Sequence, residues 1–190
     1  MAIIDDDPSA RQVLRGFLNE RGYTVASEGA DGSEALGICS TYNPDVVIMD
    51  IKMPGKDGIE AATEINRHSS VPVVLITGRE DEDTVRRAAE AGVMAYLVKP
   101  VREEELFAAI ELAISRHGEY LKLRKENVDL KNTIETRKFV EKAKGLLMEK
   151  DRITEAEAYS RIRKISMDRR MTMKEVSEII VSSLKEGGQS

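Results

Sequence analysis

Short apolar runs alternate with longer amphipathic segments over about the first hundred residues. Four of these runs are continuous and rich in β-branched side chains, as strands buried on both faces of a parallel sheet are: residues 2–4, 46–49, 73–76 and 95–98. After the first run, Asp7 and Pro8 provide an N-cap residue and a proline at the first helical position. This alternation predicts an α/β fold, a doubly wound parallel sheet with helices on both faces.

The pattern changes after Pro100, beyond which no proline occurs and the apolar spacing is helical. One long helix is predicted first, and two more begin at capping boxes, Thr154 with Glu157 and Thr172 with Glu175. We therefore predict four segments, which are an α/β domain at 1–118, a helical coiled-coil-like linker at 119–133, a small three-helix all-α domain at 134–185 and a disordered tail at 186–190.

Within the long helix, about two heptads carry apolar residues at the core positions, with one polar exception. The core positions a and d are Tyr120, Leu123, Asn127, Leu130 and Ile134. A polar Asn at one a position fixes the register and favours two parallel strands. The segment is predicted to form a homodimer; the alternative is a single amphipathic helix that packs on its own N-terminal domain.

Charge separates the two halves of the chain. Residues 1–120 contain 12 Lys and Arg against 22 Asp and Glu, whereas residues 121–190 contain 17 against 12. A basic C-terminal half favours a polyanionic partner, although solvated helix faces would give the same count. There is no apolar segment of 18 residues and no secretory start, and Cys39 is a lone, packed thiol, so we expect a cytoplasmic protein without membrane contact.

Polar side chains stand at the ends of the apolar runs. Asp5 and Asp6 follow the first, Asp50 the second, Thr77 the third and Lys99 the fourth. Because parallel strands place their carboxyl ends at one edge, these groups are expected to share a crevice. Converging carboxylates and a loop carbonyl suit Mg²⁺, and the metal and the ammonium can neutralise a phosphoryl group delivered to the remaining carboxylate.

Four motifs at these strand ends resemble the receiver domain of bacterial two-component response regulators. They are DDDP at 5–8, MDIKMPGKDG at 49–58, LITG at 75–78 and AYLVKP at 95–100. The resemblance covers residues 1–118 and implies a five-stranded, flavodoxin-like sheet. It implies Asp50 as the phosphorylated residue, Asp5 and Asp6 as the acidic pair, and Thr77 and Lys99 as partners of the phosphoryl oxygens.

The same resemblance implies further roles around the site. Asp6, Asp50 and the backbone carbonyl of Lys52 would hold Mg²⁺, Tyr96 would switch rotamer with Thr77, and the Lys99–Pro100 bond would be cis. Lys52 and Arg79 are candidates to tune the lifetime of the phosphoryl group. The donor would be a sensor histidine kinase, and the chain would be no conventional enzyme, since it catalyses only its own phosphorylation and dephosphorylation.

Basic residues gather in the C-terminal domain, and six of them are candidate nucleic-acid contacts: Arg137, Lys138, Lys144, Arg163, Arg169 and Arg170. Charge alone does not choose between DNA and RNA. The third helix carries only Lys174 and Lys185 as basic residues, and it has no Arg, Asn or Gln to read base edges, so it would make a poor DNA recognition helix.

Three segments of this domain resemble the ANTAR domain of transcription antitermination regulators. They are ETRKFVEKAKGLLMEK at 135–150, TEAEAY at 154–159 and ISMDRRMTMKEV at 165–176. The resemblance implies binding of RNA stem-loops in nascent transcripts, which prevents a terminator hairpin from forming. Phosphorylation would drive dimerisation and hence RNA binding. The alternatives are a DNA-binding response regulator and a receiver whose helical output binds a protein.

Overall fold

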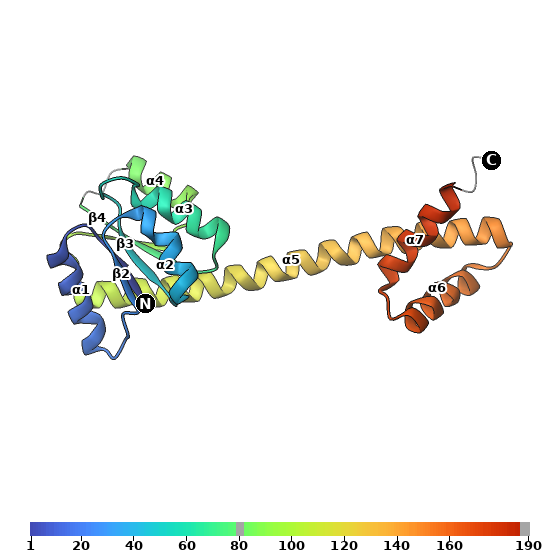
Figure 1. The fold of residues 1–190 in the computed structure, drawn as a ribbon, viewed down its shortest axis with the longest axis horizontal. Coiled ribbons are helices and arrows are strands. Elements are labelled where there is room, and N and C mark those ends of the chain that lie inside the picture. The colour runs from blue at the N-terminus through green and yellow to red at the C-terminus, as the bar shows by residue number, and fades with distance from the viewer. Residues whose placement is uncertain (79–81, 187–190) are drawn as a thin grey trace. The chain divides into compact units, whose positions relative to one another are not determined.

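A computed structural model describes residues 1–78 and 82–186, with the backbone alone for 184–186. The chain divides into two compact units, Met1–Leu121 and Lys122–Ser190, and each is described by itself (Figure 1). None of the helices in the described ranges combines the length and apolarity that crossing a bilayer would require.

The first unit is built on a five-stranded parallel sheet in the order β2-β1-β3-β4-β5. This topology confirms the predicted doubly wound sheet. The strands are β1 (Ala2–Ile4), β2 (Ser27–Gly29), β3 (Val47–Asp50), β4 (Val73–Thr77) and β5 (Ala95–Val98).

Helices cover both faces of this sheet (Figure 1). On one face, α1 and the first part of α5 bury Leu14, Leu18, Leu106 and Ile110 against the strands. On the other face, α2, α3 and α4 bury Ile38, Ile65 and Ala88. The helices are α1 (Pro8–Glu20), α2 (Ala35–Tyr42), α3 (Gly58–His68), α4 (Glu82–Glu90) and α5 (Glu103–Asp151), with a 3₁₀ turn η1 (Gly32–Glu34) before α2.

The second unit consists of the latter part of α5, α6 (Glu155–Arg169) and α7 (Met173–Glu186). Its core is small: among the described residues, six buried apolar side chains form one packed cluster, namely Ala143, Leu147, Ala158, Ile162, Val176 and Val181. Of the tail predicted at 186–190, Glu186 is the last residue of α7, and residues 187–190 lie outside the described ranges.

Both predicted capping boxes are present in the second unit. The Thr154 hydroxyl accepts a bond from the Glu157 N–H at 3.4 Å, and a Glu157 carboxylate oxygen accepts from the Thr154 N–H at 2.8 Å. Thr172 and Glu175 exchange the same two bonds at 3.2 and 2.7 Å. These reciprocal bonds satisfy backbone donors at the start of each helix and so fix where α6 and α7 begin.

Candidate functional site

Three carboxylates meet at the carboxyl edge of the sheet. Asp5 directly follows β1 and Asp50 ends β3, and both are buried, whereas Asp6 is exposed. One oxygen from each of the three carboxylates lies within 4.8 Å of the others. Three hard oxygen ligands at this separation form a donor set that fits Mg²⁺.

Lys99 joins the two buried carboxylates. Its Nζ lies 2.7 Å from Asp50 Oδ2 and 3.0 Å from Asp5 Oδ2. Partial burial by itself lowers the pKa of Lys99, but the hydrogen bonds and charges of Asp50 and Asp5 outweigh it, so the pKa stands above its ordinary value. The ammonium is therefore charged at neutral pH and holds Asp50 at the strand end.

Further hydrogen bonds hold the two aspartates in place. Asp5 Oδ1 accepts a bond from the Asp7 N–H at 2.9 Å, and its carbonyl accepts from Arg11 Nη1 at 2.6 Å. The second Asp50 oxygen, Oδ1, accepts a long bond of 3.4 Å from the Lys52 N–H. One oxygen of Asp50 thus has a close cationic partner, while the other faces the loop that follows β3.

The loop after Asp50 packs tightly against the strand that carries it. A Cβ added to Gly58 would stand 2.1 Å from the Asp50 carbonyl oxygen and 3.0 Å from the Ile51 Cα. Asp57 caps α3 by accepting a 2.8 Å bond from the Glu60 N–H, and its other oxygen binds Arg87 of α4 at 2.7 Å. The absence of a side chain at Gly58 therefore allows the close approach that places Asp50.

The remaining predicted site residues lie on the neighbouring strands and loops. Thr77 is buried at the end of β4, Tyr96 on β5 is 38% exposed, and Lys52 is exposed. The Lys99–Pro100 peptide bond is cis, as expected from the sequence. Arg79 lies outside the described residues.

On the second unit, five of the six candidate nucleic-acid contacts are exposed: Arg137, Lys138, Arg163, Arg169 and Arg170. Lys144 differs, because its side chain is 8% exposed and its ammonium binds Glu141 at 2.8 Å and Glu155 at 2.6 Å. These bonds tie α5 to the first turn of α6. The structure thus argues against an RNA contact by Lys144, and no pattern local to Lys144 reveals its partner eleven residues away.

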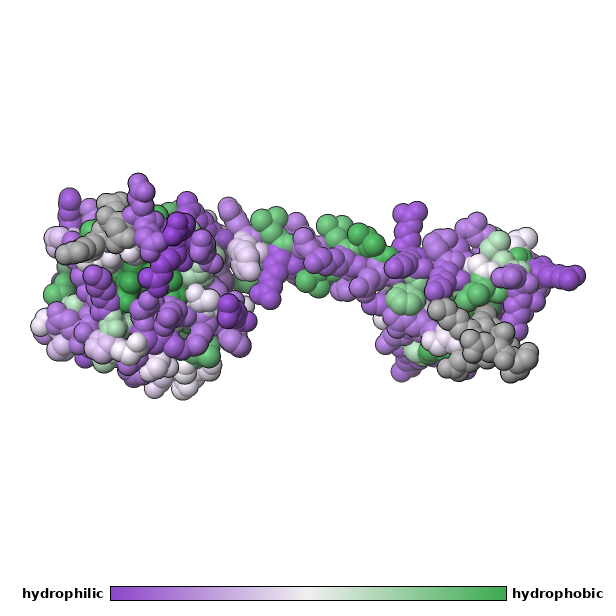
Figure 2. Space-filling model, turned by 90° about the horizontal axis from the view of Figure 1, so that it is seen from above, coloured by the Kyte–Doolittle hydropathy of each residue, from purple (hydrophilic) through white to green (hydrophobic). Residues whose placement is uncertain are grey.

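The heptad residues of α5 form an uncovered stripe, defined by Tyr120, Leu123, Asn127, Leu130 and Ile134. Their exposed fractions are 49% for Tyr120 and 63–67% for the two leucines and Ile134, and Asn127 is exposed too. Figure 2 shows hydrophobic side chains at the surface along this part of α5. A stripe of this kind is the surface that a partner helix covers in a coiled coil.

Comparisons with known proteins agree with this geometry. Residues 1–111 match the family profile of the response regulator receiver domain, and residues 128–181 match that of the ANTAR domain. The chain therefore belongs to the response regulators, with a receiver domain and an ANTAR output domain. It is a signalling protein.

Among its relatives is the transcriptional regulatory protein PdtaR of Mycobacterium tuberculosis, 46% identical over 96% of this chain and 89% of PdtaR. The receiver domain of a modulated diguanylate cyclase from Desulfovibrio desulfuricans G20 is 32% identical and has a TM-score of 0.58, covering 62% of this chain and 94% of that one. A chain of the CheX–CheY–BeF3–Mg²⁺ complex of Borrelia burgdorferi also matches. It is 25% identical with a TM-score of 0.54, over 57% of this chain and 84% of the matched chain.

Proposed function

We propose that this response regulator is phosphorylated on Asp50 by a sensor histidine kinase, and that the phosphorylated form binds RNA stem-loops in nascent transcripts and prevents transcription termination. The observation that carries the proposal is the bridge of Lys99 to Asp50 and Asp5, in a chain whose second unit matches the ANTAR domain. PdtaR, the relative that aligns over nearly the whole chain, is a transcriptional regulatory protein.

Asp50 is the acceptor in this proposal. One carboxylate oxygen forms a bond to phosphorus as the bond between phosphorus and the donor breaks. Asp5, Asp6, Asp50 and the carbonyl of Lys52 would hold Mg²⁺. When bound, Mg²⁺ would supply positive charge that neutralises the negative charge of the phosphoryl oxygens. The matched crystal structure of the CheX–CheY complex contains Mg²⁺ and BeF3, which supports binding of Mg²⁺ and a phosphoryl group by this chain.

Lys99 and Thr77 complete the site. Lys99 already binds Asp50 Oδ2 at 2.7 Å, so its ammonium can transfer that bond to a phosphoryl oxygen without moving far. Thr77 lies at the end of the adjacent strand, where its hydroxyl can donate to a second phosphoryl oxygen. In the proposed switch, Thr77 turns toward the phosphoryl group and Tyr96, now 38% exposed, turns inward.

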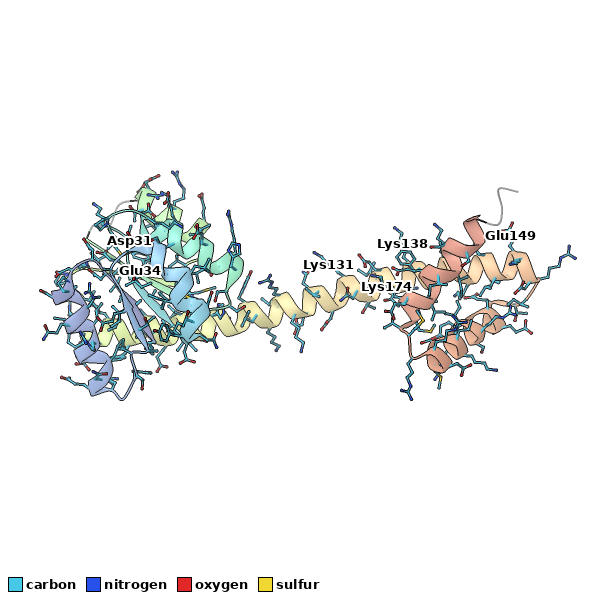
Figure 3. The ribbon with its side chains drawn as sticks, in the orientation of Figure 1. Asp31, Glu34, Lys131, Lys138, Glu149 and Lys174 are labelled. Atoms are coloured by element: carbon cyan, nitrogen blue, oxygen red, sulfur yellow. The ribbon has the colours of Figure 1, made fainter. Side chains whose placement is uncertain are left out.

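RNA binding is assigned to the exposed basic residues of the second unit, Arg137, Lys138, Arg163, Arg169 and Arg170. Cationic side chains release counterions from phosphates, so the affinity should fall steeply with salt. Figure 3 shows Lys138 on α5, and Lys174 on α7, which pairs with Glu135 of α5 at 2.6 Å. Lys174 is therefore left out of the proposed contacts.

The stripe on α5 is assigned to a phosphorylation-dependent homodimer. In a parallel, in-register pair, Glu119 and Glu126 at position g face Arg124 and Lys131 at position e of the partner, and both pairs attract. An antiparallel pair would bring like charges together, since g faces g and e faces e. Asn127 at a core a position favours the same parallel arrangement. Two output domains held side by side would bind two tandem RNA loops more tightly than one.

The first experiment compares RNA with DNA. The full chain is mixed with an RNA of two tandem stem-loops or with a DNA duplex of matched sequence, with and without beryllofluoride, in an electrophoretic shift assay. Beryllofluoride should tighten binding to the RNA, and the Asp50→Asn variant should ignore it. Equal affinity for the duplex would support a DNA-binding regulator instead, whereas salt-insensitive binding to a protein would support an interaction output.

The dimer is tested separately by light scattering. Leu130→Glu places a charge in the stripe and should keep the beryllofluoride-treated chain monomeric. Val128→Glu is the matched control, since Val128 is an apolar residue of α5 that is 50% exposed but lies two residues, or about 200°, away from Leu130 around the helix. A treated wild-type chain that remained monomeric would contradict the dimer and favour packing of the stripe on its own chain.

A further inference from the structure

A groove of about 570 Å³ lies within the second unit and is lined by residues of α5, α6 and α7. We call it the Tyr159 groove, after the aromatic residue that α6 contributes. Its volume falls within the range of roughly 300–1,000 Å³ that small-molecule sites occupy. The other lining residues used here are Asn132, Arg137 and Val140 of α5 and Met173 of α7.

The Tyr159 groove combines an accessible ring with apolar contacts. Tyr159 is 45% exposed, whereas Val140 is 7% exposed and Met173 packs against the core. The only other aromatic residue after position 121 is Phe139, which is half-buried. A flat aromatic face that remains accessible beside apolar side chains is suited to stacking a planar ring.

The polar lining suits a base better than a phosphate. Asn132 offers an amide donor and acceptor, and Arg137 offers a guanidinium that can stack on a ring or bind the adjoining phosphate. Two carboxylates, Asp129 and Glu141, also line the groove and would repel a phosphate placed inside it. They can accept hydrogen bonds from an exocyclic amino group, which adenine, guanine and cytosine carry and uracil lacks.

The groove and the dimer stripe use adjoining parts of the α5 surface. Asn132 lies two residues from Leu130 and from Ile134, which corresponds to about 200° around the helix, whereas Arg137 lies seven residues from Leu130 and therefore close to the side of the stripe. Pairing of two helices through the stripe therefore leaves the Asn132 side of each groove accessible. A dimer would present two such grooves, one for each of two RNA loops.

We propose that the Tyr159 groove holds one unpaired, amino-bearing base of the bound RNA loop, stacked on the Tyr159 ring. This inference rests on the RNA-binding function proposed above and assigns a subsite within it. Loop bases are free of pairing, so they can leave the stack and enter a groove of this kind.

The test is a double-mutant cycle on the full, beryllofluoride-treated chain. Wild-type protein first selects RNAs from a pool of tandem stem-loops with randomised loops. The selected RNA is then made with an abasic nucleotide at each loop position in turn. Three proteins are compared on each RNA: wild type, Tyr159→Leu, which keeps apolar volume without the ring, and Tyr159→Phe, which keeps the ring.

We expect Tyr159→Leu to weaken binding of the intact RNA by roughly 5- to 150-fold, the range for loss of one base–aromatic stack, while Tyr159→Phe binds almost as wild type. At one loop position, the abasic RNA should bind wild type more weakly by a similar factor, and Tyr159→Leu should then cause little further loss. The selected RNAs should also lack uracil at that position. Circular dichroism of both variants checks that α6 is intact.

The proposal fails if Tyr159→Leu binds the intact RNA as tightly as wild type, as it would if the groove received a protein segment. It also fails if the loss is the same on every abasic RNA, because the ring then contacts no single base. Selection of uracil at the loop position where the abasic change and Tyr159→Leu are not additive would overturn the role of the two carboxylates. A wild-type chain that selects no RNA would overturn the RNA-binding function and the groove together, so the two failures are distinct.

Discussion

Replacing Gly58 with alanine should damage the receiver domain at its acceptor site. The new Cβ would stand 2.1 Å from the Asp50 carbonyl oxygen, and a backbone atom cannot move aside cheaply. Overpacking of this kind costs roughly 1–3 kcal/mol of unfolding free energy, more than the ~0.5–1 kcal/mol that alanine gains over glycine in a helix. For a unit of this size, each kcal/mol shifts Tm by about 3–6 °C.

Gly37→Ala is the matched control. Gly37 lies inside α2, and nothing comes within 4 Å of a Cβ built there. Alanine at this position should therefore stabilise the receiver by ~0.5–1 kcal/mol, so the two Gly→Ala changes should shift the melting temperature in opposite directions. Differential scanning calorimetry of the full chain measures both shifts.

The site gives a second measurement for the same pair. Because the Gly58→Ala clash falls on the backbone of Asp50, beryllofluoride in the presence of Mg²⁺ should bind this variant more weakly than wild type, with Gly37→Ala unchanged. If Gly58→Ala had the melting temperature of wild type and bound beryllofluoride equally well, the loop would have room to relax. The close approach at Gly58 would then not be what positions Asp50.

Three further predictions concern other parts of the chain. Ile162→Ala removes a fully buried side chain from the small second core and should cost about 2–5 kcal/mol, so calorimetry should show the second unit melting earlier while the receiver transition stays in place. Although partial burial works to raise the pKa of Asp57, bonds from the Glu60 N–H and Arg87 hold the pKa below its usual value. The stability that ionised Asp57 contributes should thus be present above about pH 4 and lost as the pH falls further, and acid titration of Asp57→Asn should show a smaller loss than wild type. Burial raises the pKa of the Cys39 thiol to about 11, so a thiol reagent should label Cys39 at the rate of unfolding rather than at once.

The strands that could be predicted from the sequence were continuous apolar runs. β3 and β4 are buried along their length and end on Asp50 and Thr77, and β5 is directly followed by Lys99, so the pattern marks both the strand and its functional end. The expected burial of β5 on both faces is wrong, because β5 lies at the sheet edge and Tyr96 is 38% exposed. β2 has no such pattern. Its sequence Ser-Glu-Gly is short and polar, and its strand conformation depends on pairing with β1 at the sheet edge.

In the ANTAR domain, contacts between helices could not be predicted from the sequence. The sequence reports that Lys144 is basic, but not that α6 brings Glu155 to its ammonium. The Tyr159 groove was likewise out of reach, because its residues come from three helices and converge only when these pack. Local motifs mark capping boxes and strand ends well, since those depend on neighbours in sequence.

The enclosed ammonium of Lys144 also determines how lysine acylation would report on this protein. An acylating reagent attacks an uncharged, accessible amine, and Lys144 is neither, because its two carboxylates raise its pKa and its side chain is buried. Lys144 should therefore remain unlabelled with or without RNA. Lys138 is exposed and should be labelled in the free chain and protected in the RNA complex. Only lysines that react in the absence of RNA can therefore be used to map the RNA footprint.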